Sequence, residues 1–170
     1  MKRTIFAMLL VLLWASPAAA DDFSEWSWVE ANWSPCEGVG VHGSYRVTAR
    51  AKLESAGDEV KISNLTVVVS ITHAAGKVTA TGKVAVRKDG ETTQTVTLEK
   101  PWYPVIAPTH AGPMLTLPRV KSSESPSPDD AQVLTVPKGA KLEFTITAMA
   151  DTSSGACVIG NSEHEVALDS

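Results

Sequence analysis

The strongest constraint on the fold of this chain is an alternation of apolar and polar side chains with a period of two residues. Over residues 45–53, the odd positions carry Tyr, Val, Ala, Ala and Leu, whereas the even positions carry Arg, Thr, Arg and Lys. Successive side chains on a β-strand point to opposite faces, so this pattern predicts a strand with one buried face and one solvated face. Residues 65–71, 78–86 and 142–148 repeat the pattern.

The alternation changes phase in the segment that follows the first of these strands. Apolar residues occupy even positions up to Ile62 and odd positions from Leu65 onward. A single extra residue in one strand of an antiparallel pair produces such a phase change. We therefore expect a β-bulge or a bend at Ser63-Asn64.

Turn signals separate the expected strands. Asp-Gly at 89–90 favours a tight hairpin turn because both residues tolerate a positive φ, and further turns are expected at 137–139 and 151–155. Strands are expected at 45–53, 60–71, 78–86, 92–98, 114–117, 132–136, 142–148, 156–159 and 165–168.

This spacing of strands and turns predicts an all-β fold, and we expect an immunoglobulin-like β-sandwich of about eight short strands. No tryptophan lies between Cys36 and Trp102. The Cys–Trp–Cys arrangement of antibody domains is therefore absent, and the expected likeness is one of architecture alone.

Residues 101–130 interrupt the regular pattern. Seven of the ten prolines fall here: Pro101, Pro104, Pro108, Pro113, Pro118, Pro126 and Pro128. Proline removes a donor from the strand ladder, so this segment is predicted to be an irregular connection with at most a short edge strand around 114–117. Residues 121–130 (KSSESPSPDD) are expected to form a polar, mobile loop.

The first twenty residues have the order of a secretory signal peptide. Lys2 and Arg3 precede the apolar run 5–14, which is followed by the small-residue stretch 15–20. The apolar run is shorter than the roughly 20 residues that span a bilayer. We expect cleavage before Asp21, a periplasmic or secreted location, and no insertion into the membrane.

The remaining residues, 21–170, are expected to form a single domain. Without Lys2 and Arg3, the chain keeps 13 of its 15 basic residues against 19 acidic ones, a net charge of −6 with histidine neutral. This balance argues against a nucleic-acid partner. Cys36 and Cys157 are the two cysteines, and in an oxidising compartment they are predicted to form a disulfide.

Two aromatic pairs are candidate ligand-binding residues. Trp26 and Trp28 would project from one face of an extended segment and could stack on sugar rings, but covering one open end of the sandwich is the favoured interpretation. Trp102 and Tyr103, inside the proline-rich connection, are the better candidates for an exposed contact.

Neither metal nor catalytic chemistry is predicted. The histidines, His42, His73, His110 and His164, show no metal-ligand spacing, although a periplasmic copper site is an alternative that the compartment allows. No G-x-S-x-G motif occurs. The acidic pair Asp129-Asp130 lies in a polar segment, where carboxylates are usually solvated. We predict no metal ligands, no catalytic residues and no cofactor.

The sequence thus favours a non-catalytic binding or accessory module that is secreted or periplasmic. Its expected partner is an envelope or extracellular protein, contacted through the 101–130 connection or through a strand edge. A carbohydrate-binding module that uses exposed Trp and Tyr, with a glycan as ligand, and a copper-binding sandwich are the alternatives.

Overall fold

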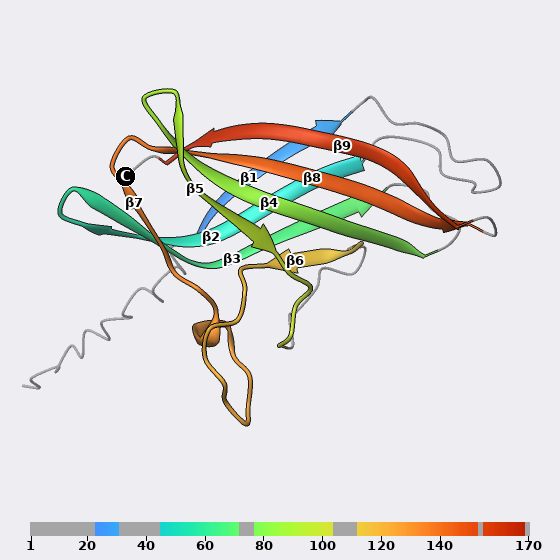
Figure 1. Cartoon of the computed structure of the whole chain (residues 1–170), viewed down its shortest axis with the longest axis horizontal. Helices are drawn as coiled ribbons and strands as arrows, with labels where there is room; N and C mark the ends of the chain where they lie inside the picture. Colours follow the sequence, from blue (N-terminus) through green and yellow to red (C-terminus); the bar gives the residue numbers. More distant parts are fainter. Residues whose placement is uncertain (1–22, 31–44, 72–76, 104–111, 153–154, 169–170) are drawn as a thin grey trace, which may run out of the picture.

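The structure is a computed structural model that describes residues 23–30, 45–71, 77–103, 112–152 and 155–168. These residues form nine strands and one turn of 3-10 helix, and none of them is α-helical (Figure 1). The elements are β1 (Phe23–Glu30), β2 (Tyr45–Ala56), β3 (Glu59–Ile71), β4 (Val78–Lys88), β5 (Glu91–Leu98), β6 (Met114–Thr116), η1 (Pro128–Asp130), β7 (Leu134–Pro137), β8 (Lys141–Thr152) and β9 (Gly155–Ala167).

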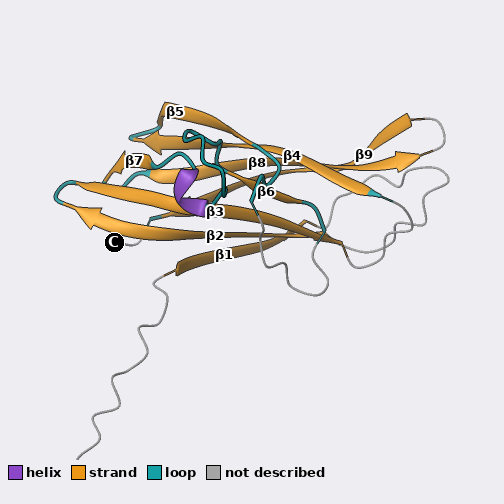
Figure 2. Cartoon of the chain, turned by 90° about the horizontal axis from the view of Figure 1, so that it is seen from below, coloured by secondary structure: helices purple, strands orange, loops and turns teal. Residues whose placement is uncertain are grey.

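The strands form two antiparallel sheets. The first sheet has the order β1-β2-β3-β6, with β7 pairing to another part of β3, and the second has the order β5-β4-β8-β9. Figure 2 shows the sheets as two layers. The predicted all-β, sandwich-like architecture is confirmed. The immunoglobulin-like part is not, because constant-type immunoglobulin sheets place the fifth strand beside the second, whereas β3 lies beside β2 here.

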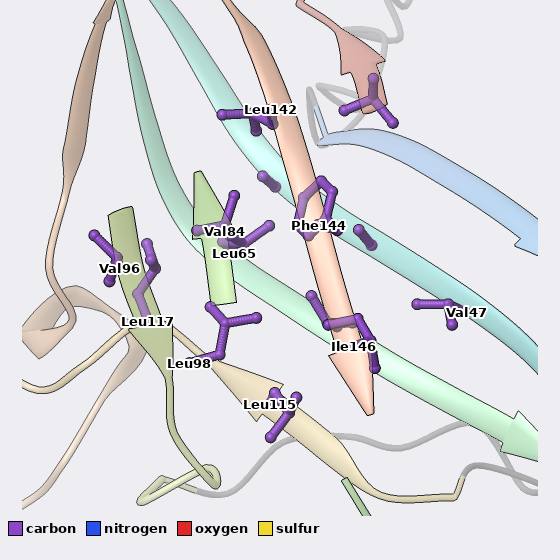
Figure 3. Close-up of a cluster of buried hydrophobic side chains, with 14 of the residues drawn as sticks. Val47, Leu65, Val84, Val96, Leu98, Leu115, Leu117, Leu142, Phe144 and Ile146 are labelled. Atoms are coloured by element: carbon purple, nitrogen blue, oxygen red, sulfur yellow. The ribbon is translucent and has the colours of Figure 1, made fainter. Parts of the chain in front are cut away.

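The predicted inward faces fill the space between the sheets. Val47 on β2 and Leu65 on β3 are buried, as are Leu142, Phe144 and Ile146 on β8. Figure 3 shows these side chains gathered in one cluster. Burying side chains of this size contributes roughly 1.5–3 kcal/mol each to stability. The burial of the alternating apolar residues is therefore the main contribution that stabilises the fold.

The bulge expected at Ser63-Asn64 is confirmed. Arg50 pairs with Thr66 and Lys52 pairs with Ser63, so two residues of β3 lie opposite one residue of β2. Asn64 has a φ of 54°, a left-handed conformation that asparagine tolerates better than most residues. Because of the bulge, the apolar side chains of β3 point into the core both before and after Asn64.

The hairpin at Asp89-Gly90 is also confirmed, with φ values of 52° and 87°. The expected turn at 137–139 ends in Gly139, whose φ is 73°, and the amide of Ala140 donates to the carbonyl of Pro137 at 3.1 Å. Part of the turn expected at 151–155 lies outside the described residues.

One prediction of the strand pattern is wrong: the two strands expected at 156–159 and 165–168 are parts of one long strand, β9, which ends at Ala167. The inward positions between them are Gly160 and Ser162, which are buried, and His164, which is half-buried. These residues interrupt the apolar alternation because Gly160 leaves room for a neighbouring ring and Ser162 accepts a hydrogen bond from Trp28. A Cβ on Gly160 would lie 2.7 Å from the ring of Tyr45, so only glycine fits beside that ring.

The two edges of the sandwich are joined differently. At one edge, the amide of Glu99 donates to the carbonyl of Thr116 at 2.8 Å, and the amide of Thr116 donates back to the carbonyl of Glu99 at 2.7 Å. At the other edge, Trp28 of β1 contacts β9 through its side chain. Both sheets are thereby held in one layered body.

Residues 1–22 lie outside the described part of the chain, so the signal peptide stays a prediction. Among the residues that are described, no helix is long and apolar enough to cross a membrane.

The bulge supplies a test of the backbone conformation. Asn64→Val is expected to lower the free energy of unfolding by about 1–2 kcal/mol, the cost of holding a side chain with a β-carbon branch in the left-handed region. Asn64→Gly relieves that strain and is the matched control. Urea denaturation of both variants measures the difference, and equal losses would show that the asparagine side chain, rather than its φ, matters.

Candidate functional site

Trp28 of β1 belongs to the interior of the sandwich. Trp28 is 7% exposed, and its Nε1 donates to Ser162 Oγ at 2.6 Å. Its ring stacks on His164 with centroids 4.5 Å apart and an interplanar angle of 13°. Trp26 is half-buried and packs against the same core. The interpretation of Trp28 as cover for the sandwich is confirmed, and its use as a sugar-stacking surface is wrong because the indole is enclosed.

The second aromatic pair is also less exposed than predicted. Tyr103 is 8% exposed, and Trp102 is half-buried against the core, with its ring edge-on to Tyr103 at a centroid distance of 4.9 Å. Burial raises the pKa of the Tyr103 hydroxyl, while a hydrogen bond with the Thr66 side chain acts in the opposite direction. The expected exposure is wrong for Tyr103, because the Glu99–Thr116 hydrogen bonds hold this segment against the first sheet, whereas the half-buried Trp102 stays a candidate for contact.

The polar segment after β6 forms a closed loop. Arg119 and Ala131 make an isolated β-bridge, and the amide of Gln132 donates to the carbonyl of Pro118 at 2.8 Å. We call residues 119–131 the bridge loop. Compact surface loops of this length with adjoining ends are frequently functional.

Asp130 organises the bridge loop from within. Its carboxylate accepts from the amide of Ser127 at 3.0 Å and from Ser123 Oγ at 2.8 Å. These two hydrogen bonds, helped by the positive charges of Arg119 and Lys121, hold the pKa of Asp130 below its ordinary value. The expectation of a solvated carboxylate is wrong for Asp130, which is 8% exposed. The predicted polar loop is present, and it has its own internal order.

Arg119 joins the bridge loop to the aromatic pair. Its guanidinium lies over the ring of Trp102, 5.0 Å from the centroid. The same group donates from Nε to the carbonyl of Lys121 at 2.7 Å and from Nη2 to the carbonyl of Ser123 at 2.9 Å. The Arg119 side chain therefore connects residues 121–123 of the bridge loop to the indole of Trp102.

The sequence indicates the segment that contains the bridge loop, but it does not reveal the roles of Arg119 and Asp130. Asp130 had a signal, since Ser127 precedes it by three residues in the spacing of a capping box, and the structure contains that box. Arg119 had none, because its partners are an indole and two carbonyls that only the folded chain brings together.

Of the two cysteines predicted to form a disulfide, the structure describes only Cys157. Cys157 lies on β9 and packs against the core, and the described residues contain no free cysteine. Cys36 lies outside the described residues, so its pairing with Cys157 stays a prediction.

Metal binding is tested only in part. No group of three His, Cys, Asp or Glu side chains is placed to hold a metal within the described residues, but His42, His73 and His110 fall outside them.

Comparison with protein-family models, curated proteins and solved structures finds no significant match. The function is therefore inferred from the residues and their geometry.

The burial of Trp28 makes its role measurable. Trp28→Ala is expected to lower the free energy of unfolding by about 3–5 kcal/mol, because the variant loses apolar contacts, leaves a cavity and loses the hydrogen bond to Ser162. The neighbouring Val29 is 51% exposed, so Val29→Ala is the matched control and is expected to change stability by less than about 0.5 kcal/mol. Thermal and urea unfolding report both values. If Trp28→Ala is as stable as the wild type, the indole is not a core residue and becomes a candidate for ligand binding again.

The Asp130 carboxylate predicts a pH dependence with a defined sign. Because its pKa is lower in the folded protein than in the unfolded chain, it stabilises the fold above the unfolded pKa of about 3.9 and loses this effect as the pH falls through the folded pKa. Asp130→Asn is expected to be less stable than the wild type at neutral pH and to approach it in acid. Unfolding free energies measured across this pH range test the convergence, with Asp129→Asn, at an exposed position, as the control. A constant gap between wild type and Asp130→Asn would contradict the proposed role.

Proposed function

We propose that this protein is a non-catalytic binding or accessory module, secreted or periplasmic, that contacts an envelope or extracellular protein through the bridge loop. In this proposal the domain is immunoglobulin-like in its two-layer packing rather than in its strand order. The signal peptide at 1–20 and the Cys36–Cys157 disulfide are parts of the same proposal, and both rest on the sequence.

The observation that carries the proposal is the internal order of the bridge loop. A binding segment loses conformational freedom when it meets its partner, and a segment that is already ordered loses less. The Arg119–Ala131 bridge closes this loop, and the Asp130 carboxylate ties its interior together. Loops supported by a rigid scaffold are common binding elements.

The surface of the loop and its flank offers groups that a protein partner can use. Val120 is 62% exposed and Val133, just beyond the loop, is 50% exposed, although large apolar side chains generally favour burial. The exposed Lys121 and Glu124 lie in the same connection. Apolar side chains with polar neighbours match the mixed composition of protein interfaces.

The aromatic geometry favours a protein partner over a glycan. A sugar ring needs an open aromatic face, but Trp28 and Tyr103 are buried and the ring of Trp102 has Arg119 over it. Trp28, Tyr103 and Trp102 therefore do not offer the flat open platform that the carbohydrate alternative requires.

The proposal is tested by capture from an envelope fraction, using the full-length protein as bait and crosslinking with mass spectrometry as the readout. Val120→Asp places a charge on the loop without removing its internal hydrogen bonds, and it is expected to abolish recovery of the captured protein. Thr97→Asp on β5 adds the same charge at an exposed site on the second sheet and is the matched control. Unchanged capture by Val120→Asp, and by a variant lacking residues 121–130, would refute the role of the loop.

A further inference from the structure

Both sheets carry ion pairs between exposed or half-exposed side chains, and on β2 of the first sheet Lys52 pairs with Glu54 at 3.0 Å. On the second sheet, Arg87 pairs with Glu143 and Lys141 pairs with Glu165, each at 2.6 Å between nitrogen and oxygen. On the first sheet, Arg46 and Arg50 project outward from β2, and both are exposed. Neither arginine forms an ion pair with any residue that the structure describes.

The guanidinium of Arg50 makes a cation–π contact with Phe23 and forms no ion pair with a described carboxylate. It sits 4.2 Å from the centroid of the Phe23 ring. Glu25 stands directly opposite Arg50 in the β1–β2 pairing, yet no ion pair joins them within the described residues. The planar guanidinium has five N–H donors, and none of those of Arg50 is used by a described acceptor.

This cationic face is continuous with the aromatic pair beside the bridge loop. Thr66 lies opposite Arg50 in the β2–β3 pairing, and the Thr66 side chain hydrogen-bonds Tyr103. Tyr103 contacts Trp102, which lies under Arg119. The surface thus runs from β2 across β3 to the start of the bridge loop.

Its composition is that of a protein-binding surface. Arginine and tryptophan, which this face presents as Arg46, Arg50, Arg119 and the half-buried Trp102, are among the residue types that most often dominate interface energies. Two half-buried apolar residues belong to the same sheet: Val68 of β3 and Met114 of β6, which pair with each other. These apolar side chains can contact the body of a partner segment while the guanidinium groups bind its charges.

We propose that this face, from Arg46 and Arg50 to Trp102 and Arg119, binds an acidic segment of the partner protein. The inference rests on the proposed function and names the chemistry of the partner. Charge complementarity is the argument: on a chain that is acidic overall, two guanidinium groups form no ion pair with a described residue, and the guanidinium fork matches a carboxylate. A glycan fits less well, because the rings of Phe23 and Trp102 each have a guanidinium over them.

The test uses the full-length protein and a fluorescein-labelled peptide of alternating glutamate and serine, with binding followed by fluorescence anisotropy. Arg46→Gln/Arg50→Gln is expected to weaken peptide binding about tenfold or more, because charge-assisted hydrogen bonds are lost. Arg87→Gln/Lys141→Gln removes the same charge from the second sheet and is expected to leave the affinity within about twofold, since those cations are already paired.

Three results would overturn the proposal. The first is that the wild type does not bind the peptide at low salt. The second is an equal loss in both double variants, which would indicate attraction by net charge alone. The third is tighter binding of heparin than of the peptide with the same dependence on Arg46 and Arg50, which would assign the face to a sulfated glycan.

The outcome separates this inference from the proposed function. If capture of the envelope protein needs Val120 but survives Arg46→Gln/Arg50→Gln, the bridge loop binds the partner and the acidic-segment inference fails. If the peptide binds through the arginines but capture ignores Val120, the loop-based function fails and the cationic face stands. Both double variants change exposed or half-exposed side chains, so circular dichroism and thermal unfolding are expected to show intact folding.

Discussion

The contact of Trp28 with β9 is the interaction on which the arrangement of the two sheets depends. The first sheet ends at β1 and the second ends at β9, so this edge has no shared backbone ladder. The indole fills the gap by donating to Ser162, stacking on His164 and approaching Phe144. The opposite edge is held by backbone hydrogen bonds between Glu99 and Thr116. With both edges joined, the outer surfaces keep a fixed relation to each other.

That fixed relation is what makes the bridge loop and the cationic face one surface. The Glu99–Thr116 hydrogen bonds bring Trp102 and Tyr103 onto the first sheet, and Arg119 carries the contact from Trp102 into the loop. A loop held only at its ends would move independently of the sheet. Here a chain of side-chain contacts from β3 to Asp130 ties the loop to the scaffold, and a partner would meet both parts at once.

Much of the fold could be predicted because the interior is nearly uniform in its chemistry. Val47, Phe144 and their neighbours alternate with polar residues, so counting positions is enough to find most of the strands after residue 45 and even the bulge at Asn64. The prediction failed where an inward position serves a particular neighbour. Gly160 makes room for Tyr45 and Ser162 accepts from Trp28, and neither residue is apolar enough to extend the pattern through β9.

The sequence by itself determined the all-β class, the inward faces, the main turns and the segment that carries the candidate site, because each follows from local periodicity or local backbone preference. Only the tertiary structure decided which aromatic residues are buried, and that the arginines of β2 form no ion pair with any described residue on the face that continues to Trp102 and Arg119. These properties depend on residues far apart in the chain. Burial, ion pairing and ring stacking are settled by which strands meet, and strand order cannot be read from alternation.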